Sequence, residues 1–151
     1  MVISRPIPKE KGIKGAAGAE SETVIAAALI QAGYTVLTPN GYMHRYDLVI
    51  EDANGAFWKI QCKTAWLTGG GSTIDFSTAS LLQAGQRGRK ISTRKPYKND
   101  VHYFAVYSPD TRKVYLIPIE GTPNTTMRLR LTETSKNGQK KGIKYAVDYE
   151  L

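Results

Sequence analysis

Apolar residues recur at helical spacing in one segment near the start of the chain, residues 16–32. The positions that would share the buried side of this helix are Val24, Ile25, Ala28, Leu29 and Ala32. Spacings of three and four residues place side chains on one side of an α-helix. Gly33 follows at the position where a glycine commonly ends a helix. We therefore predict an amphipathic helix over residues 16–32.

The rest of the chain shows short β-rich runs separated by turn residues, a pattern typical of sheets. The predicted strands are 34–38, 46–52, 56–66, 73–76, 101–108 and 113–119, with less regular segments at 127–131 and 143–149. We expect hairpins around Asn54-Gly55 and Pro109-Asp110-Thr111, and a weak helical turn at 78–86. This order of elements predicts an α/β or α+β domain on a mixed β-sheet.

The register of the first hairpin decides which side chains meet. A two-residue turn at Asn54-Gly55 would mix apolar and polar side chains on both faces of the hairpin. A three-residue loop with Gly55 in the left-handed conformation pairs Asp52 with Ala56 instead. The apolar pairs that follow are Leu48 with Ile60, Ile50 with Trp58, and Tyr46 with Cys62. We predict this register because a slip of one residue would bury unpaired charges.

The same register places Asp47 directly opposite Gln61, with Lys63 one diagonal step away. Opposed residues have Cβ atoms about 4.5–5.5 Å apart, and diagonal neighbours about 7–8 Å apart. A carboxylate, a carboxamide and an ammonium group would therefore gather on one face of the hairpin. We expect this face to be turned away from the core.

Length and composition fit one globular domain of 151 residues, with 41% hydrophobic and 23% charged residues. We expect a basic arm at residues 1–14 and a single domain at residues 15–151. The longest apolar run, Val24–Ile30, is far shorter than the roughly 20 residues of a membrane span. A single cysteine, Cys62, cannot form an intrachain disulfide, so we expect a reducing, cytoplasmic location.

The net charge of +8 favours a polyanionic partner, most often nucleic acid. Residues 87–98 contain no acid and read as a loop or arm that contacts DNA. The DNA-binding candidates are Arg87, Arg89, Lys90, Arg94, Lys95 and Lys98 in this segment, Arg128 and Arg130 on one strand face, and Ser77 after a glycine-rich loop. A second basic stretch contains Lys136, Lys140, Lys141 and Lys144. A solvated surface remains the alternative for these basic groups, and turn chemistry for Ser77.

Asp47, followed after thirteen residues by Gln61-Cys62-Lys63-Thr64, resembles the signature of the PD-(D/E)XK nuclease superfamily. Residues 45–50, 60–65, 100–107 and 114–118 resemble one small branch, which includes homing endonucleases encoded in group I introns. The core of that branch is similar to archaeal Holliday-junction resolvases. The likeness covers about residues 14–151 and implies a restriction-endonuclease-like core, a mixed β-sheet flanked by helices.

The resemblance implies a Mg²⁺ site, in which Mn²⁺ would substitute. Its ligands would be Asp47, Glu22, Gln61 and the backbone carbonyl of Cys62, with Lys63 as a catalytic group that stabilises negative charge. Glu20 competes with Glu22, which we prefer because it lies above the core-facing stripe of the helix. Gln61 departs from the usual acidic residue and adds no charge, so we expect weaker metal binding and one well-held ion.

The function implied is a Mg²⁺-dependent endonuclease that hydrolyses phosphodiester bonds in double-stranded DNA. One small active site per chain cuts both strands most simply in a symmetric homodimer or homotetramer. A Holliday-junction resolvase or restriction-type nuclease is the nearest alternative. A non-catalytic DNA-binding domain with a degenerate nuclease site is the alternative from another class.

Overall fold

The computed structural model describes residues 16–86, 89–133 and 141–151. The predicted arm at residues 1–14 and the DNA-binding candidate Arg87 lie outside these ranges, as do Lys136 and Lys140. The elements are α1 (Ala16–Gln31), β1 (Thr35–Leu37), β2 (Leu48–Glu51), β3 (Phe57–Thr64), β4 (Trp66–Thr68), the 3-10 turn η1 (Gly69–Gly71), β5 (Thr73–Ser77), β6 (Ala79–Gln86), β7 (Arg89–Pro96), β8 (Tyr103–Ser108), β9 (Lys113–Pro118), β10 (Thr126–Arg130) and the 3-10 turn η2 (Ala146–Tyr149). No helix in the described ranges is long and apolar enough to cross a membrane.

The predicted N-terminal helix is confirmed as α1. Gly33 ends it with φ 98°. The Gly33 N–H donates to the Ile30 carbonyl at 3.0 Å, and the Tyr34 N–H donates to the Leu29 carbonyl at 3.1 Å. These two bonds form a Schellman motif, which satisfies carbonyls at the end of the helix. Ser21, Ile25 and Leu29 are buried along one side of α1.

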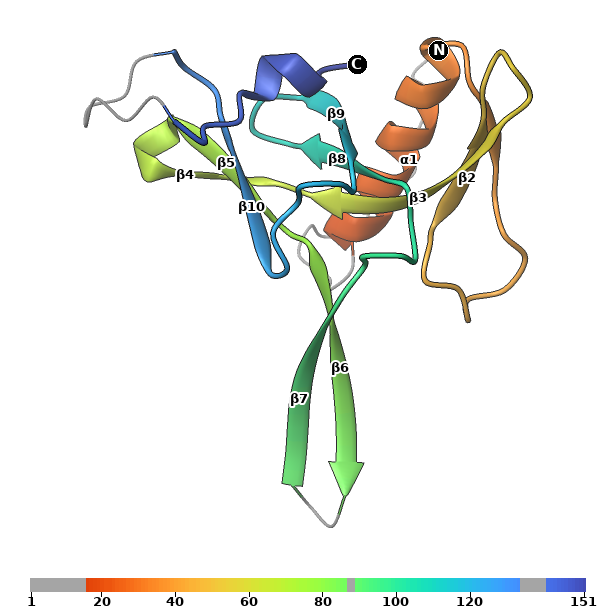
Figure 1. The fold of residues 1–151 in the computed structure, drawn as a ribbon, viewed down its shortest axis with the longest axis vertical. Coiled ribbons are helices and arrows are strands. Elements are labelled where there is room, and N and C mark those ends of the chain that lie inside the picture. Colours follow the sequence, from red (N-terminus) through yellow and green to blue (C-terminus); the bar gives the residue numbers. More distant parts are fainter. Residues whose placement is uncertain (1–15, 87–88, 134–140) are drawn as a thin grey trace, which may run out of the picture.

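The predicted mixed sheet is confirmed as a five-stranded sheet in the order β1-β2-β3-β8-β9 (Figure 1). Its strands pair antiparallel except for β3 and β8, which are parallel. The helix α1 packs on one face of this sheet through Ile25 and Leu29. The opposite face, where we expected helical cover, packs against a three-stranded sheet in the order β10-β5-β4. The central sheet is therefore covered on both faces.

The first hairpin has the predicted register. Leu48 pairs with Ile60 and Ile50 with Trp58, and Gly55 adopts φ 75° in the loop. Because β2 begins at Leu48, the expected pairing of Tyr46 with Cys62 is wrong. Tyr46 instead packs against the core on the other face of the sheet.

We expected the face that carries Gln61 and Lys63 to be turned away from the core, and this prediction is wrong. These residues align on β3 with Phe104 and Val106 of the parallel neighbour β8. Phe104 and Val106 are fully buried against the second sheet. The site therefore lies at the margin of a second core, because β4, β5 and β10 fold over this face.

The strand predicted over residues 56–66 is divided in two. β3 ends at Thr64, and β4 begins at Trp66 in the second sheet. Between them, the fully buried Ala65 donates its N–H to the Tyr107 carbonyl at 2.9 Å. The chain thus passes from one sheet to the other two residues after Lys63.

The helical turn predicted at 78–86 is wrong, and of the loop or arm predicted at 87–98 the arm is the alternative found, with residues 89–96 in a β-strand. β6 and β7 form one antiparallel hairpin, from the pair Ala79–Pro96 to the pair Gln86–Arg89. This hairpin projects away from the body of the protein (Figure 1). Apolar and polar residues do not alternate regularly along these two strands, so no strand pattern marks them in the sequence.

Candidate metal and nuclease site

Asp47 and Gln61 meet where β2 begins beside β3. The Asp47 Oδ2 atom accepts a hydrogen bond from Gln61 Nε2 at 2.6 Å and another from the Cys62 N–H at 2.8 Å. The backbone N–H of Asp47 donates to the Ile60 carbonyl at 2.9 Å. The Asp47 carboxylate thus accepts the hydrogen bond of a β3 backbone N–H that would otherwise go to a backbone carbonyl of a neighbouring strand. This bond fixes the carboxylate against β3.

Glu22 reaches the same region from α1. Glu22, Gly18, Ser21, Cys62, Lys63 and Thr64 line a cavity of about 210 Å³ between the helix and the end of β3. A 2.6 Å hydrogen bond between the Ser21 and Thr64 hydroxyls joins helix and strand beside it. The competing acid Glu20 does not line this cavity. Of the two acids considered for α1, Glu22 is therefore the one that lines this cavity.

The pKa values of both carboxylates are raised above their ordinary values. Burial is the main cause that raises the pKa of Asp47, although the Cys62 N–H, Lys63 and Gln61 oppose it. Burial, followed by the charge of Asp47, raises the pKa of Glu22. A cation between them would relieve both effects. Burial also raises the pKa of the Cys62 thiol, so Cys62 would contribute its backbone carbonyl rather than a thiolate.

Gln61 provides a direct test of whether these groups fit a divalent cation. Its Nε2 atom, a positive pole, lies 2.6 Å from Asp47 Oδ2 and 3.5 Å from the Cys62 carbonyl oxygen. Two of the expected oxygen ligands therefore converge on one point. Rotation of the carboxamide would turn its oxygen, in place of its NH2 group, toward a cation held by these two oxygens. The described residues contain no group of three or more His, Cys, Asp or Glu side chains suited to a metal, so carbonyl and amide oxygens would complete an all-oxygen set, which fits Mg²⁺.

Lys63 lies beside these groups but is not paired with them. Its Nζ atom donates to the Tyr97 hydroxyl at 3.4 Å and lies 4.6 Å from the centre of the Tyr97 ring. Among the described residues, no ion pair within 4.0 Å joins Lys63 to Asp47 or Glu22. Burial lowers the pKa of Lys63, and the nearby Asp47 carboxylate opposes this shift.

The comparisons with known proteins agree with this geometry. Residues 14–151 match the family model described as PD-(D/E)XK endonuclease. The chain belongs to the PD-(D/E)XK endonuclease family. No curated protein matches the chain significantly.

Among solved structures, this nuclease is similar to a bacterial homing endonuclease, I-Ssp6803I. The two chains are 23% identical, and the match has a TM-score of 0.70 and covers 92% of this chain and 89% of the other. The predicted restriction-endonuclease-like fold is therefore confirmed. PD-(D/E)XK nucleases generally use divalent metal ions, which agrees with the oxygen ligands that converge here.

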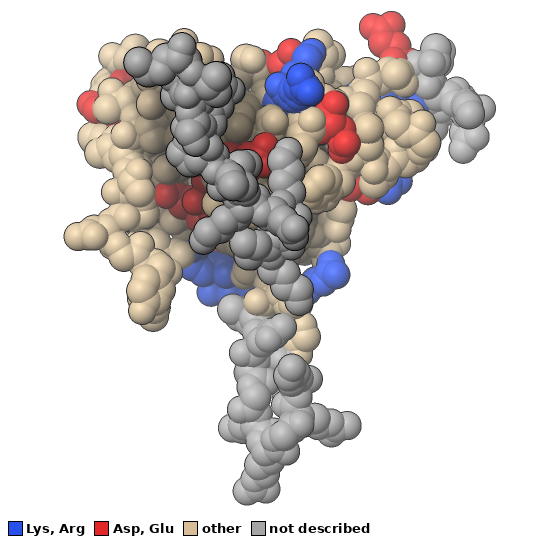
Figure 2. Space-filling view, turned by 180° about the vertical axis from the view of Figure 1, so that it is seen from behind, with Lys and Arg blue, Asp and Glu red and all other residues tan. Residues whose placement is uncertain are grey.

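The basic candidates lie apart from Asp47 and Glu22. Arg94 and Lys95 are exposed on β7, whose first residues are Arg89 and Lys90, and Lys98 is exposed just after this strand. Figure 2 shows acidic side chains in a hollow near the centre of one face and basic side chains below them, where the hairpin meets the body. The charged side chains in this view therefore form an acidic region with a basic region beside it.

Of the remaining DNA-binding candidates, Arg128 and Ser77 have hydrogen-bond partners within the nuclease. Arg128 forms two hydrogen bonds with the Asp75 carboxylate, at 2.8 and 2.7 Å. Arg130 shares its strand face and, with Lys144, helps to line a separate cavity of about 210 Å³. The Ser77 hydroxyl donates to the Ala79 carbonyl at 2.9 Å, a contact typical of turn chemistry.

Sequence reasoning missed two residues at the site, Tyr97 and Arg45. Tyr97 contacts Lys63 across 34 positions of sequence. Arg45 lies two residues before Asp47 and places its guanidinium 4.4 Å from the centre of the Tyr97 ring. No spacing rule in the sequence connects Arg45 or Lys63 with Tyr97.

Proposed function

We propose that this nuclease is a Mg²⁺-dependent DNA endonuclease of the homing type, which hydrolyses phosphodiester bonds in double-stranded DNA. The observation that carries the proposal is the convergence of Asp47 with Gln61, beside Lys63 and within electrostatic range of Glu22. Asp47, Glu22, the Cys62 carbonyl and the Gln61 amide oxygen would hold the ion. When bound, Mg²⁺ would activate a water and offset negative charge at the phosphate.

Lys63 would act on the phosphate. It lies on the same strand as Gln61 and lines the cavity beside Glu22. An ammonium group aimed at the scissile phosphate stabilises the negative charge that develops in the transition state. Burial lowers the pKa of Lys63, but the Asp47 carboxylate opposes this shift and favours the charged form. We therefore assign Lys63 an electrostatic and positioning role rather than that of a general base.

The substrate would be double-stranded DNA in the cytoplasm, bound through the β6–β7 hairpin. The exposed Arg94, Lys95 and Lys98 on and after β7 supply positive charge. Each phosphate that such a group neutralises makes the affinity more sensitive to salt. A homodimer or homotetramer would present two sites to the two strands.

The test is incubation of the purified protein with an intronless target duplex, a generic duplex and a four-way junction, each in Mg²⁺ and in EDTA. Cleavage of the intronless duplex in Mg²⁺ alone is expected, with Lys63→Met inactive but still bound to DNA. Mn²⁺ should replace Mg²⁺. Selective cleavage of the junction would indicate a resolvase instead, and equal cleavage of the generic duplex would argue against homing specificity.

The second candidate is a non-catalytic DNA-binding domain. It is favoured by one observation, the neutral Gln61 in place of the acidic residue of the signature. In that case wild type and Lys63→Met would bind DNA alike and neither would cut any of the three substrates. Cleavage by wild type that is lost in Lys63→Met would exclude this candidate.

A further inference from the structure

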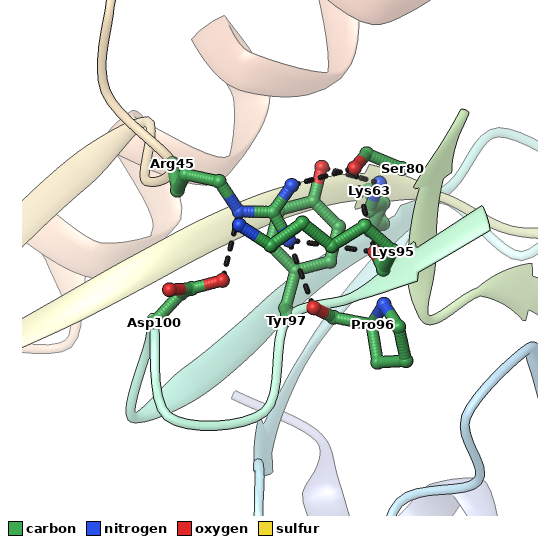
Figure 3. A network of polar contacts seen from close by, with 7 residues as sticks. All are labelled: Arg45, Lys63, Ser80, Lys95, Pro96, Tyr97 and Asp100. Atoms are coloured by element: carbon green, nitrogen blue, oxygen red, sulfur yellow. Dashed lines mark hydrogen bonds and ion pairs between the residues drawn. The ribbon is translucent and has the colours of Figure 1, made fainter. Parts of the chain in front are cut away.

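Tyr97 lies at the base of the β6–β7 hairpin, directly after the last residue of β7, and its ring contacts two cationic groups (Figure 3). The Lys63 Nζ atom lies 4.6 Å from the ring centre, and the Arg45 guanidinium carbon lies 4.4 Å from it. Cations are attracted to the face of an aromatic ring at such distances. Neither contact is part of the metal-ligand set described above.

The Tyr97 ring is held firmly. Its side chain is buried, with the residue only 7% exposed, and the Phe104 ring packs perpendicular to it, with 5.8 Å between the ring centres and an angle of 89° between the planes. The Tyr97 carbonyl accepts hydrogen bonds from the N–H groups of Asp100 at 2.9 Å and Val101 at 3.4 Å. The ring is therefore a fixed surface, against which a long lysine side chain loses much of its freedom.

Arg45 connects this ring to both strands of the hairpin. Its Nη1 atom donates to the Ser80 hydroxyl on β6 at 2.6 Å, and its Nη2 atom donates to the Pro96 carbonyl at the end of β7 at 2.8 Å. Its Nε atom forms an ion pair with Asp100 at 2.8 Å. Since Arg45 lies two residues before Asp47, the same short segment supplies the carboxylate of the site and the clamp on the hairpin.

The Lys63 ammonium contacts Tyr97 instead of forming an ion pair with Asp47. An ion pair between Lys63 and Asp47 would neutralise both groups that the reaction requires. The ring instead attracts the ammonium without neutralising it. The Tyr97 hydroxyl oxygen accepts a hydrogen bond from Lys63 Nζ at 3.4 Å. The Asp47 carboxylate stays available to the metal and the Lys63 charge to the phosphate.

We propose that Tyr97 is a positioning residue, which holds the Lys63 ammonium toward the scissile phosphate while Arg45 fixes the Tyr97 ring to the base of the hairpin. This inference rests on the proposed nuclease function. The aromatic face carries the effect, so phenylalanine at position 97 should largely preserve it and leucine should not.

The kinetic test compares Tyr97→Leu and Tyr97→Phe with a matched control, Tyr115→Leu. Tyr115 is 1% exposed in the same hydrophobic core, but its hydroxyl pairs with Thr111, away from Lys63. Single-turnover cleavage is measured at saturating DNA and Mg²⁺, and DNA affinity is measured separately in EDTA. We expect Tyr97→Leu to slow cleavage about 10- to 30-fold with DNA affinity unchanged. Tyr97→Phe should restore most of the rate, and Tyr115→Leu should cleave as wild type does.

A second measurement needs no activity. The aromatic ring current should shift the side-chain methylene signals of Lys63 upfield in the NMR spectrum of the wild-type protein without DNA. Tyr97→Phe should keep this shift and Tyr97→Leu should lose it. If Tyr97→Leu does not fold, the wild-type shift and the Tyr97→Phe rate decide the question.

The outcomes separate the two proposals. Wild-type rates in Tyr97→Leu, equal slowing in Tyr115→Leu, or unshifted Lys63 signals in wild type would overturn the positioning role and leave the nuclease function standing. A wild-type protein that cleaves no DNA would overturn the nuclease function, and the positioning role with it. The Lys63 signals would then report only whether the Tyr97 contact exists.

Discussion

Replacing Asp47 by Asn should abolish the response of the fold to Mg²⁺ without damaging the fold. Asn has nearly the same shape, and its Oδ1 atom can accept the Cys62 N–H that Asp47 Oδ2 accepts at 2.8 Å. The same oxygen can also keep the hydrogen bond from Gln61 Nε2, because both bonds end on Oδ2 of Asp47. The variant therefore loses the charge and keeps the local hydrogen bonds.

Without metal, the direction of the change in stability caused by Asp47→Asn follows from the pKa of Asp47, which burial raises. A carboxyl group with a pKa raised by folding stabilises the protein below its unfolded pKa, and this stability is lost as the pH rises through the folded pKa. At neutral pH in EDTA, wild type carries an unfavourable buried charge that Asp47→Asn lacks. The variant should be at least as stable as wild type under these conditions.

The magnitude with metal follows from linkage. At a Mg²⁺ concentration about 100 times its Kd, binding stabilises the folded wild-type protein by about 2.7 kcal/mol. For a chain of 151 residues, that energy corresponds to a rise in Tm of roughly 5–10 °C. Loss of an outer-shell partner typically weakens metal binding by about 10–100-fold, so we expect loss of the charged ligand Asp47 to weaken it by at least about 100-fold, the upper end of that range. Asp47→Asn should then gain less than about 0.4 kcal/mol at the same Mg²⁺ concentration.

The assay is thermal unfolding at neutral pH without DNA, first in EDTA and then over a Mg²⁺ titration. Asp75→Asn is the matched control, because Asp75 is a half-buried carboxylate paired with Arg128 at 2.7 Å and does not line the cavity beside Glu22. This control should keep the full Mg²⁺ response. An equal rise in Tm for Asp47→Asn and wild type would show that Asp47 is not a ligand and would refute the reasoning.

Three further results are expected. Gln61→Glu adds a carboxylate beside Asp47, so it should lower the Mg²⁺ concentration at the midpoint of the thermal-shift titration and lower Tm in EDTA; an unchanged midpoint would place Gln61 outside the metal site. Phe104→Ala removes a fully buried ring and should cost about 3–5 kcal/mol in denaturant unfolding, whereas a loss below about 1 kcal/mol would contradict the packing described. The Arg128 hydrogen bond holds the pKa of Asp75 below its usual range, so wild type should lose stability as the pH falls below about 4, and Asp75→Asn should lose less over the same window.

Part of the candidate site follows from local sequence. The meeting of Asp47 with Gln61 depends on the loop in which Gly55 adopts φ 75°, and on the alternation of apolar residues along β2 and β3. Turn chemistry and alternation are properties of neighbouring residues, so they can be read without the rest of the fold. The β6–β7 hairpin shows the converse, because apolar and polar residues do not alternate regularly along its two paired strands and leave no strand pattern to read.

The sequence alone therefore determined the helix that Gly33 ends, the register of the first hairpin and the pairing of Asp47 with Gln61, because each depends on residues close together in the chain. Only the tertiary structure decided what covers the face of Lys63 and what holds its ammonium. Tyr97 and the second sheet reach Lys63 through packing between segments far apart in sequence. Such contacts are selected by the free energy of burying the whole core, which no local pattern contains.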